Sequence, residues 1–301
     1  MFCKIDEGII VRGTFFMPYQ NTIETAVTYT GTGLHSGQKV TITLQPAAVD
    51  TGIVFRRTDL PGQPEIEAIA AHVTSTIRAT TIEKNEVRIF TIEHLLSALH
   101  ALRIDNCLIA IDAEEPPVGD GSSLLFFELL EQAGVCCQQK ERQEIIIDKV
   151  YRIDDGDRFV MVVPYDGFRV SFTSLNPHPL IGVQYGDYPV TIETYRKEIA
   201  PARTIAYEAE IAALKKMGLG LGGTFENVIV YNDEGWLNEL RFADELVRHK
   251  ILDVIGDLRL AGEIRGHVIA VKSGHALNTA LAKKISAAFA VQKISGREAE
   301  A

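Results

Sequence analysis

The stretch "GQKVTITLQPAAVDTGIVF" (37–55) decides the type of fold, because it reads as two strands joined through a turn. Its apolar residues alternate or run continuously, as they do in strands, and Pro and Gly mark the turn. The same order of strand, Pro, Gly turn and strand ending in Phe returns in "GDRFVMVVPYDGFRVSF" (156–172). This repetition suggests two similar units.

The later parts of the two units also match. "TIEHLLSALHAL" (91–102) has apolar residues at helical spacing and precedes the strand-like "NCLIAID" (106–112). "FADELVRHKILDVIGDL" (242–258) precedes "HVIAVKS" (267–273) in the same way. Each late strand then leads to one more expected helix, at 122–134 and at 276–291. Chance can produce one such match, but the same order in both halves favours duplication.

The sequence therefore predicts an α+β fold made of two similar two-layer domains that arose by internal duplication. Helices packed on sheets are the expected layers. We expect the first domain at 21–142 and the second at 143–295. Residues 1–20 are interpreted as an extension, and we assign no function to them.

One segment, 202–233, has no counterpart in the first half. It reads as strand, helix, glycine loop and strand, and its "GLGLGG" invites comparison with a dinucleotide-binding loop. Such glycines belong between a strand and the helix that it opens. Here they follow a helix, where Gly218 would serve as a C-terminal cap, so a nucleotide-binding loop is the disfavoured alternative.

Composition limits the classes of protein that fit. The chain has 301 residues, of which 46% are hydrophobic and 23% charged, as in a globular protein. A net charge of −10 argues against nucleic acid as a partner. No apolar run is long enough for a transmembrane segment, and no signal-peptide block opens the chain. The four cysteines form no disulfide pattern, so we expect a cytoplasmic protein.

Two histidines occupy equivalent places in the two halves. His94 and His249 each lie on the helix that precedes the late strand, and Asp253 follows His249 by one helical turn. If the two domains pack face to face, these three side chains can meet. Two imidazoles and a carboxylate, with a fourth position left for water, describe a catalytic zinc site. A structural zinc would favour four ligands including thiolates, and the cysteines lack the spacing for that.

Acid–base groups lie close to these candidate ligands in the sequence. Glu93 directly precedes His94, and a carboxylate beside a metal-binding histidine can act as the general base. His275 begins the last helix just after a strand, a position that suits a general acid or an oxyanion donor. Asp257 could accept a hydrogen bond from His275 and favour its charged form.

Less specific interpretations of these residues stay open at this point. A helix with His, Lys and Asp on one side is most often a solvated face, and an isolated Glu–His pair is a weak signal. The remaining histidines have no partner pattern, and we expect surface or core positions for His35, His72, His100, His178 and His267.

Eight motifs in order from residue 30 to residue 278 carry a resemblance to a known family. They are "TGTGLHSG", "RRTDL", "TIEHLLSAL", "DGSS", "ARTIAY", "LGLGGTFENVIV", "LRFADELVRHKILDVIGDL" and "KSGHALN". Together they resemble the UDP-3-O-acyl-N-acetylglucosamine deacetylases, the zinc amidases of lipid A biosynthesis. The family has two similar α+β domains with the active site between them, which agrees with the expected duplication.

The resemblance implies a role for each candidate residue. It makes His94, His249 and Asp253 the ligands of one Zn²⁺ per chain, Glu93 the general base, and His275 the general acid oriented by Asp257. It implies that Thr204 contacts the oxyanion and that 202–233 forms an apolar passage for the acyl chain. The substrate-binding residues that we expect from it are Lys250, Lys272, Ile205 and Tyr207; many relatives carry Phe in place of Ile205.

The predicted function is hydrolysis of the N-acetyl group of a UDP-3-O-(3-hydroxyacyl)-N-acetylglucosamine, giving acetate and a free amine. The predicted partner is this UDP-sugar lipid, and we expect a monomer. The rival from another class is a non-catalytic protein that binds lipid or sugar nucleotide and holds a structural metal. A zinc peptidase is the alternative among enzymes, but no HExxH sequence is present.

Overall fold

The computed structural model describes residues 19–299, and two large sheets organise them. The first sheet has the strand order β2 (Val27–Thr32), β3 (Lys39–Pro46), β9 (Cys107–Ile111), β4 (Ile53–Arg57) and β5 (Glu65–Glu67). The second has the order β12 (Tyr151–Asp155), β13 (Arg158–Val163), β18 (Glu263–Val271), β14 (Phe168–Leu175) and β15 (Val183–Pro189), and β11 (Glu144–Ile146) also pairs with β18.

The two sheets share one topology. Along both strand orders the pairs are antiparallel, antiparallel, parallel and antiparallel. The two strands of each quoted stretch do not pair with each other, because the late strand of that half, β9 or β18, lies between them. The α+β class is thus confirmed, and the shared topology is what an internal duplication predicts.

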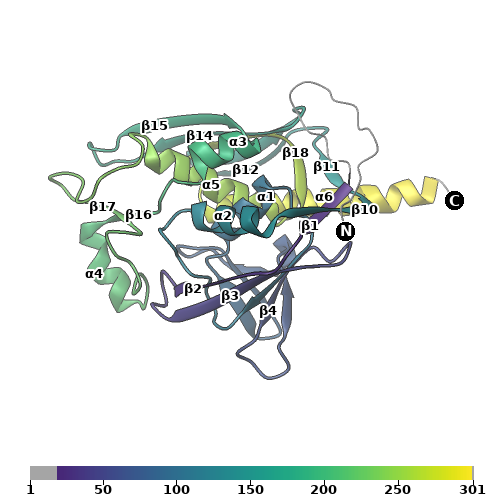
Figure 1. The fold of residues 1–301 in the computed structure, drawn as a ribbon. Coiled ribbons are helices and arrows are strands. Elements are labelled where there is room, and N and C mark those ends of the chain that lie inside the picture. Colours follow the sequence, from purple (N-terminus) through teal and green to yellow (C-terminus); the bar gives the residue numbers. More distant parts are fainter. Residues whose placement is uncertain (1–18, 300–301) are drawn as a thin grey trace.

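Helices fill the space between the two sheets (Figure 1). The four longest apart from the insert are α1 (Glu93–Ala101), α2 (Leu124–Ala133), α5 (Glu245–Arg259) and α6 (His275–Ala299). All nine residues of α1 are buried, and α1 packs against α5 at the centre of the molecule. His249, Asp253 and Asp257 on α5 are buried, so a solvated helix face is excluded for these three residues.

Several element boundaries differ from the predictions. The helix expected from residue 91 begins at Glu93, because Thr91 has a φ of 57°, which an α-helix does not allow. The helix expected from residue 242 begins at Glu245, and the strand expected from residue 267 begins at Glu263. Strand β1 (Tyr19–Ile23) starts inside the expected extension and pairs with β10 (Val135–Glu141).

A small three-stranded sheet in the first half was not predicted. It consists of β6 (Val73–Ser75), β7 (Thr81–Lys84) and β8 (Val87–Phe90), and it follows the short 3₁₀ helix η1 (Ala70–His72). These strands are only three or four residues long, so their sequences show little periodicity. The sheet lies directly before α1 in the chain and fixes the segment that enters this helix.

The insert at 202–233 has the predicted order of elements. Strand β16 (Ile205–Tyr207) leads into α4 (Glu208–Lys216), and β17 (Ile229–Tyr231) returns parallel to β16. Gly218 has a φ of 75° just after α4, as expected for a C-terminal cap. Before the insert lie the short helices α3 (Ile192–Thr194) and η2 (Tyr195–Ile199).

The insert belongs to the second half in sequence but touches the first half in space. The Leu221 N–H donates to the His35 carbonyl at 3.2 Å, and the Gly222 N–H donates to the Leu34 carbonyl at 3.0 Å. A Cβ at Gly222 would lie 2.2 Å from the Gly33 carbonyl oxygen, so only glycine allows this close approach. Helix α4 has no fully buried residue and lies at the edge of the molecule (Figure 1).

Among the helices that the structure describes, none combines the length and apolar character needed to cross a membrane.

Candidate active site

A cavity of about 710 Å³ lies where the starts of α1 and α6 and one side of α5 face the insert. Its wall contains most of the residues that the sequence predicted to be catalytic, metal-binding or substrate-binding. The predicted residues in the lining are Glu93, His94, Thr204, Ile205, Tyr207, His249, Lys250, Asp253 and His275. One cavity therefore collects candidates from both halves of the chain.

His94, His249 and Asp253 form a compact buried cluster in this cavity, as the spacing predicted. Their potential ligand atoms all lie within 4.8 Å of one another. The Asp253 Oδ1 atom is 3.9 Å from His94 Nε2 and 3.5 Å from His249 Nε2. This oxygen is buried and accepts no hydrogen bond from the described residues. A buried carboxylate oxygen left without a donor is what a metal ligand requires.

The protonation states of the cluster also suit a cation. Burial, with His249 beside it, lowers the pKa of His94 to about 3, and burial lowers the pKa of His249. Both imidazoles are therefore neutral at pH 7 and offer lone pairs. His249 Nδ1 lies 3.1 Å from the Ala202 carbonyl, so Nδ1 carries the proton and Nε2 faces the cluster.

Asp253 is held in its charged form by its neighbours. Burial alone would raise its pKa, but Lys250 and then His249 outweigh burial and lower it. The Lys250 ammonium donates to Asp253 Oδ2 at 2.8 Å and leaves Oδ1 for the cluster. Two neutral imidazoles and one carboxylate are a donor set that fits a divalent transition metal such as zinc.

Glu93 lies beside this cluster without joining it. Burial raises the pKa of its carboxyl group to about 7, which places the group close to the range of a general base at neutral pH. The Thr80 backbone N–H donates to Glu93 Oε2 at 3.1 Å, while Oε1 lies 3.9 Å from His275 Nε2. One oxygen of the Glu93 carboxylate is thus held by a hydrogen bond, and the other oxygen faces His275, the candidate general acid.

His275 forms the predicted pair with Asp257. His275 Nδ1–H donates to Asp257 Oδ2 at 2.9 Å. Burial would lower the pKa of His275, but Asp257, followed by Glu93 and Asp253, raises it to about 10. The imidazole is therefore charged at neutral pH and can donate a proton. Asp257 does not line the cavity. It is fully buried and contacts His275 through the hydrogen bond to Nδ1.

Two residues that the sequence analysis missed complete this arrangement. The Thr80 hydroxyl donates to Asp257 Oδ1 at 2.5 Å, and Asn278 Nδ2 donates to Asp257 Oδ2 at 2.9 Å. Asn278 follows His275 by three residues in "KSGHALN", and that spacing on one helix face was a usable signal. Thr80 is distant in sequence from Asp257, and no local pattern points to it.

The predicted substrate-binding residues divide into two groups. Lys250, Ile205 and Tyr207 line the cavity as expected. Lys272 is absent from the lining; its ammonium pairs with Asp157, so a role in substrate binding stays a prediction. Thr204 lines the cavity, and its backbone is fixed by hydrogen bonds with Gly121 and Ile229.

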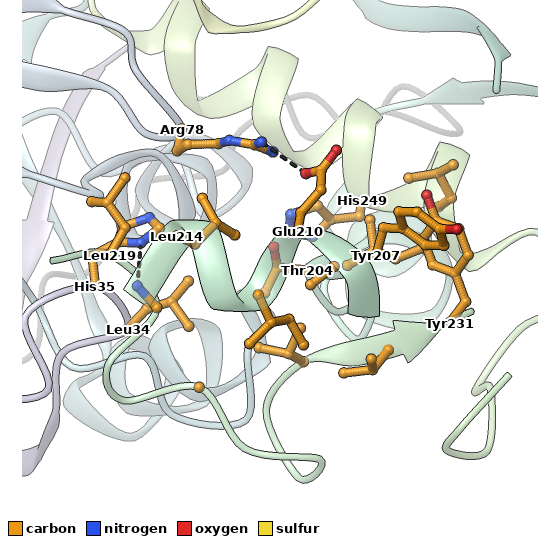
Figure 2. A pocket seen from close by; sticks show the side chains of 18 of the residues that line it. Leu34, His35, Arg78, Thr204, Tyr207, Glu210, Leu214, Leu219, Tyr231 and His249 are labelled. Atoms are coloured by element: carbon orange, nitrogen blue, oxygen red, sulfur yellow. Dashed lines mark hydrogen bonds and ion pairs between the residues drawn. The ribbon is translucent and has the colours of Figure 1, made fainter. Parts of the chain in front are cut away.

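The insert and the first half enclose an apolar part of the cavity, seen in Figure 2. Its apolar lining residues include Leu34, Ile211, Leu214, Leu219, Val228 and Val230. An ion pair between Arg78 and Glu210, 2.8 Å long, joins the first half to α4 at this point (Figure 2). These apolar side chains can hold an alkyl chain, and the same cavity is also lined by Glu93, His275 and the cluster.

His35 is a further cavity residue that the sequence did not assign. It was expected on the surface or in the core, but it lines the cavity, and its Nδ1 accepts from the Gly220 N–H at 3.3 Å (Figure 2). His35 lies in the quoted motif "TGTGLHSG", and that motif was the available signal. The other histidines without a partner pattern, His72, His100, His178 and His267, do not line this cavity.

Comparison with known proteins agrees with this geometry. Residues 20–287 match the sequence model of the family described as UDP-3-O-acyl N-acetylglycosamine deacetylase. The chain is 44% identical to the UDP-3-O-acyl-N-acetylglucosamine deacetylase of Syntrophotalea carbinolica, with 90% of this chain and 89% of that protein covered. It is 45% identical to the protein of the same name from Chlamydia abortus, with 88% and 96% covered.

A third relative of the same name, from Marinobacter nauticus, is 43% identical, with 89% of this chain and 90% of that protein covered. The range matched by the family model, residues 20–287, spans the cluster, the cavity lining and the insert. The chain therefore belongs to the family of UDP-3-O-acyl N-acetylglycosamine deacetylases.

Proposed function

We propose that this protein hydrolyses the N-acetyl group of a UDP-3-O-acyl-N-acetylglucosamine and releases acetate, as the names of its relatives describe for those proteins. The observation that carries the proposal is one cavity in which Glu93 and His275 flank the cluster of His94, His249 and Asp253. Amide hydrolysis needs a polarised carbonyl, a group that accepts a proton from water and a group that protonates the amine.

His94, His249 and Asp253 would hold one zinc ion in this proposal. Zinc bound there would supply Lewis-acid polarisation of the amide carbonyl and a water of lowered pKa. The neutral imidazoles and the unpartnered Asp253 Oδ1 support this assignment. Lys250 contributes indirectly, since its bond to Oδ2 keeps the Asp253 carboxylate charged and oriented.

Glu93 would accept the proton of the attacking water. Its carboxyl has a pKa of about 7, so an appreciable fraction is ionised at neutral pH and can act as a base. His275 would then give a proton to the nitrogen that leaves. Its pKa of about 10 keeps it charged until that step, and Asp257 stabilises the charge. Thr204 would contact the carbonyl oxygen as negative charge develops on it.

The apolar and the polar lining residues of the cavity suit the two parts of the substrate. The apolar wall from the insert and the first half would hold the acyl chain, and Ile205 and Tyr207 line the same cavity. Lys250 would meet polar groups of the sugar nucleotide. The volume of about 710 Å³ is within the usual range of small-molecule sites.

The proposal is tested by incubating the purified protein with UDP-3-O-acyl-N-acetylglucosamine and measuring acetate and the free amine. Release of both in equal amounts, at a rate that depends on Glu93, is the expected result. The Glu93→Gln protein is the matched control, because it keeps the shape of the site and removes the base. Tight binding of the substrate with no acetate release would favour a non-catalytic binding protein instead.

A further inference from the structure

We propose that Thr80 is a positioning residue that links the general base to the carboxylate partner of the general acid. The inference rests on the roles proposed above for Glu93, His275 and Asp257. Thr80 is fully buried and does not line the cavity, so it acts through these residues and not on the substrate.

Two hydrogen bonds from one residue carry the inference. The Thr80 backbone N–H donates to Glu93 Oε2 at 3.1 Å, and its hydroxyl donates to Asp257 Oδ1 at 2.5 Å. Glu93 begins α1 in the first half, whereas Asp257 lies near the end of α5 in the second half. Thr80 therefore fixes the base and the acid's partner relative to each other across the two halves.

The hydroxyl bond determines how Asp257 faces His275. Asp257 Oδ2 accepts from His275 Nδ1 and from Asn278 Nδ2, each at 2.9 Å. Among the described residues, Thr80 supplies the side-chain hydrogen bond to the other oxygen, Oδ1. A hydroxyl has one hydrogen to donate, and here that hydrogen is committed to the carboxylate. With Oδ1 held, the carboxylate plane is set and Oδ2 stays directed at the imidazole.

The small sheet β6–β7–β8 explains how Thr80 is held in place. Thr80 immediately precedes β7, and β7 pairs with β8, which leads through Thr91 into Glu93. The pair Thr81–Phe90 lies at the end of this hairpin nearest both residues. The hairpin thus fixes the distance between Thr80 and the start of α1. The small sheet, which was not predicted, therefore helps to position the residues of the site.

Substitution of Thr80 by valine tests the hydroxyl alone, because valine has nearly the same shape and keeps the backbone N–H. We expect Thr80→Val to lower kcat roughly ten- to a hundredfold, the range for a lost hydrogen bond to a charged group. KM and the metal content should stay unchanged. Thr80→Ser restores the hydroxyl and should recover kcat to within about threefold of the wild-type protein. If the valine protein does not fold, Thr80→Ala serves in the same comparison.

Thr22→Val is the matched control for a purely structural effect. The Thr22 hydroxyl is also buried in the first half, where it donates to the Asn106 carbonyl at 2.7 Å and accepts from the Ala47 N–H at 2.9 Å. Thr22→Val should lower the thermal midpoint of unfolding at least as much as Thr80→Val does and should leave kcat unchanged. An equal loss of kcat in both variants would assign Thr80 a structural role only.

A double-mutant cycle with Asp257→Ala shows whether Thr80 acts through Asp257. In that background the Thr80 hydroxyl has lost its acceptor, so Thr80→Val should change kcat less than about twofold. Losses that multiply, or an unchanged kcat in Thr80→Val alone, would overturn the inference. Failure of the proposed function is recognised separately, because then the wild-type protein would release no acetate or Glu93→Gln would remain fully active.

Discussion

Gly256 of α5 lies directly against the backbone of Glu93 in α1, so that a Cβ at position 256 would stand 2.0 Å from the Glu93 carbonyl oxygen. Gly256 is the one glycine in these two helices. Because α5 carries His249 and Asp253 while α1 carries His94, the separation of the two helices sets the size of the cluster. Glycine at this position lets ligands from both halves come within reach of one ion.

Gly256→Ala is therefore expected to weaken metal binding. The new methyl group cannot fit beside the Glu93 carbonyl, so α1 and α5 must move apart and His94 must leave the cluster. We expect metal affinity to fall by about tenfold or more, together with the roughly 1–3 kcal/mol of destabilisation typical of overpacking. Titration of the metal-free protein with zinc measures the affinity.

Gly266→Ala is the control for this prediction. A Cβ at Gly266 would lie 2.8 Å from Ile147 Cγ1 and 2.9 Å from Val162 Cγ2, so it is also crowded, but outside the metal cluster. It should lose stability and keep its metal affinity. Equal metal affinities in Gly256→Ala and the wild-type protein would show that helix separation does not control the site.

Glu93→Gln separates the base from the metal ligands. The variant should keep its metal and lose on the order of 10²–10⁴ in kcat, because glutamine cannot accept the proton. Asp253→Ala should lose metal affinity as well, since it removes a ligand atom. Elemental analysis beside steady-state kinetics gives both quantities. A Glu93→Gln protein that has lost its metal, or one with unchanged kcat, would contradict the role of Glu93.

His275 should govern the high-pH limb of activity. The charged imidazole is the active form, and the carboxylate of Asp257 helps raise its pKa to about 10. Activity is then present below this pKa and is lost as pH rises through it. Asp257→Asn removes the negative partner and lowers the pKa of His275, so the falling limb of the kcat/KM profile should move to lower pH. A limb in the same place in both proteins would remove Asp257 from this pair.

The apolar side of the cavity should respond to the length of the acyl chain. Each buried methylene contributes about 0.8 kcal/mol, so trimming the 3-O-acyl chain by two carbons should reduce kcat/KM up to about fifteenfold. Leu214→Phe adds bulk to the lining and should shift the preference toward shorter chains. Leu221→Phe, in the same insert but outside the lining and half exposed, is the control. Equal kcat/KM for acylated and unacylated UDP-sugar would exclude an acyl site here.

The sequence predicted the parts of this site that follow from helical periodicity and from repetition. Residues four apart on one helix, such as His249 and Asp253, had to share a face, and the duplicated order brought His94 to an equivalent place. The burial of this helix face could not be derived from the periodicity, because the sequence does not show which segment packs against the polar residues. In the structure, α1 packs against this face of α5.

The missed features depend on contacts between distant segments. Thr80 lies just before a strand that is too short to show a pattern, and its bond to Asp257 joins distant segments. Gly256 is not distinguished in the sequence from any other glycine within a helix, and its role depends on the packing of α1 against it. Lys272 was assigned from its motif, but its side chain pairs with Asp157. The domain limits, the monomeric state and the cytoplasmic location stay predictions.

The most direct test of the account is acetate release before and after removal of metal. Protein treated with a chelator and freed of it should hold less than about one tenth of a zinc per chain and should release no acetate from UDP-3-O-acyl-N-acetylglucosamine. Addition of about one equivalent of zinc should restore the original rate. Protein confirmed as metal-free by elemental analysis that still hydrolyses the substrate at the full rate would contradict the central claim.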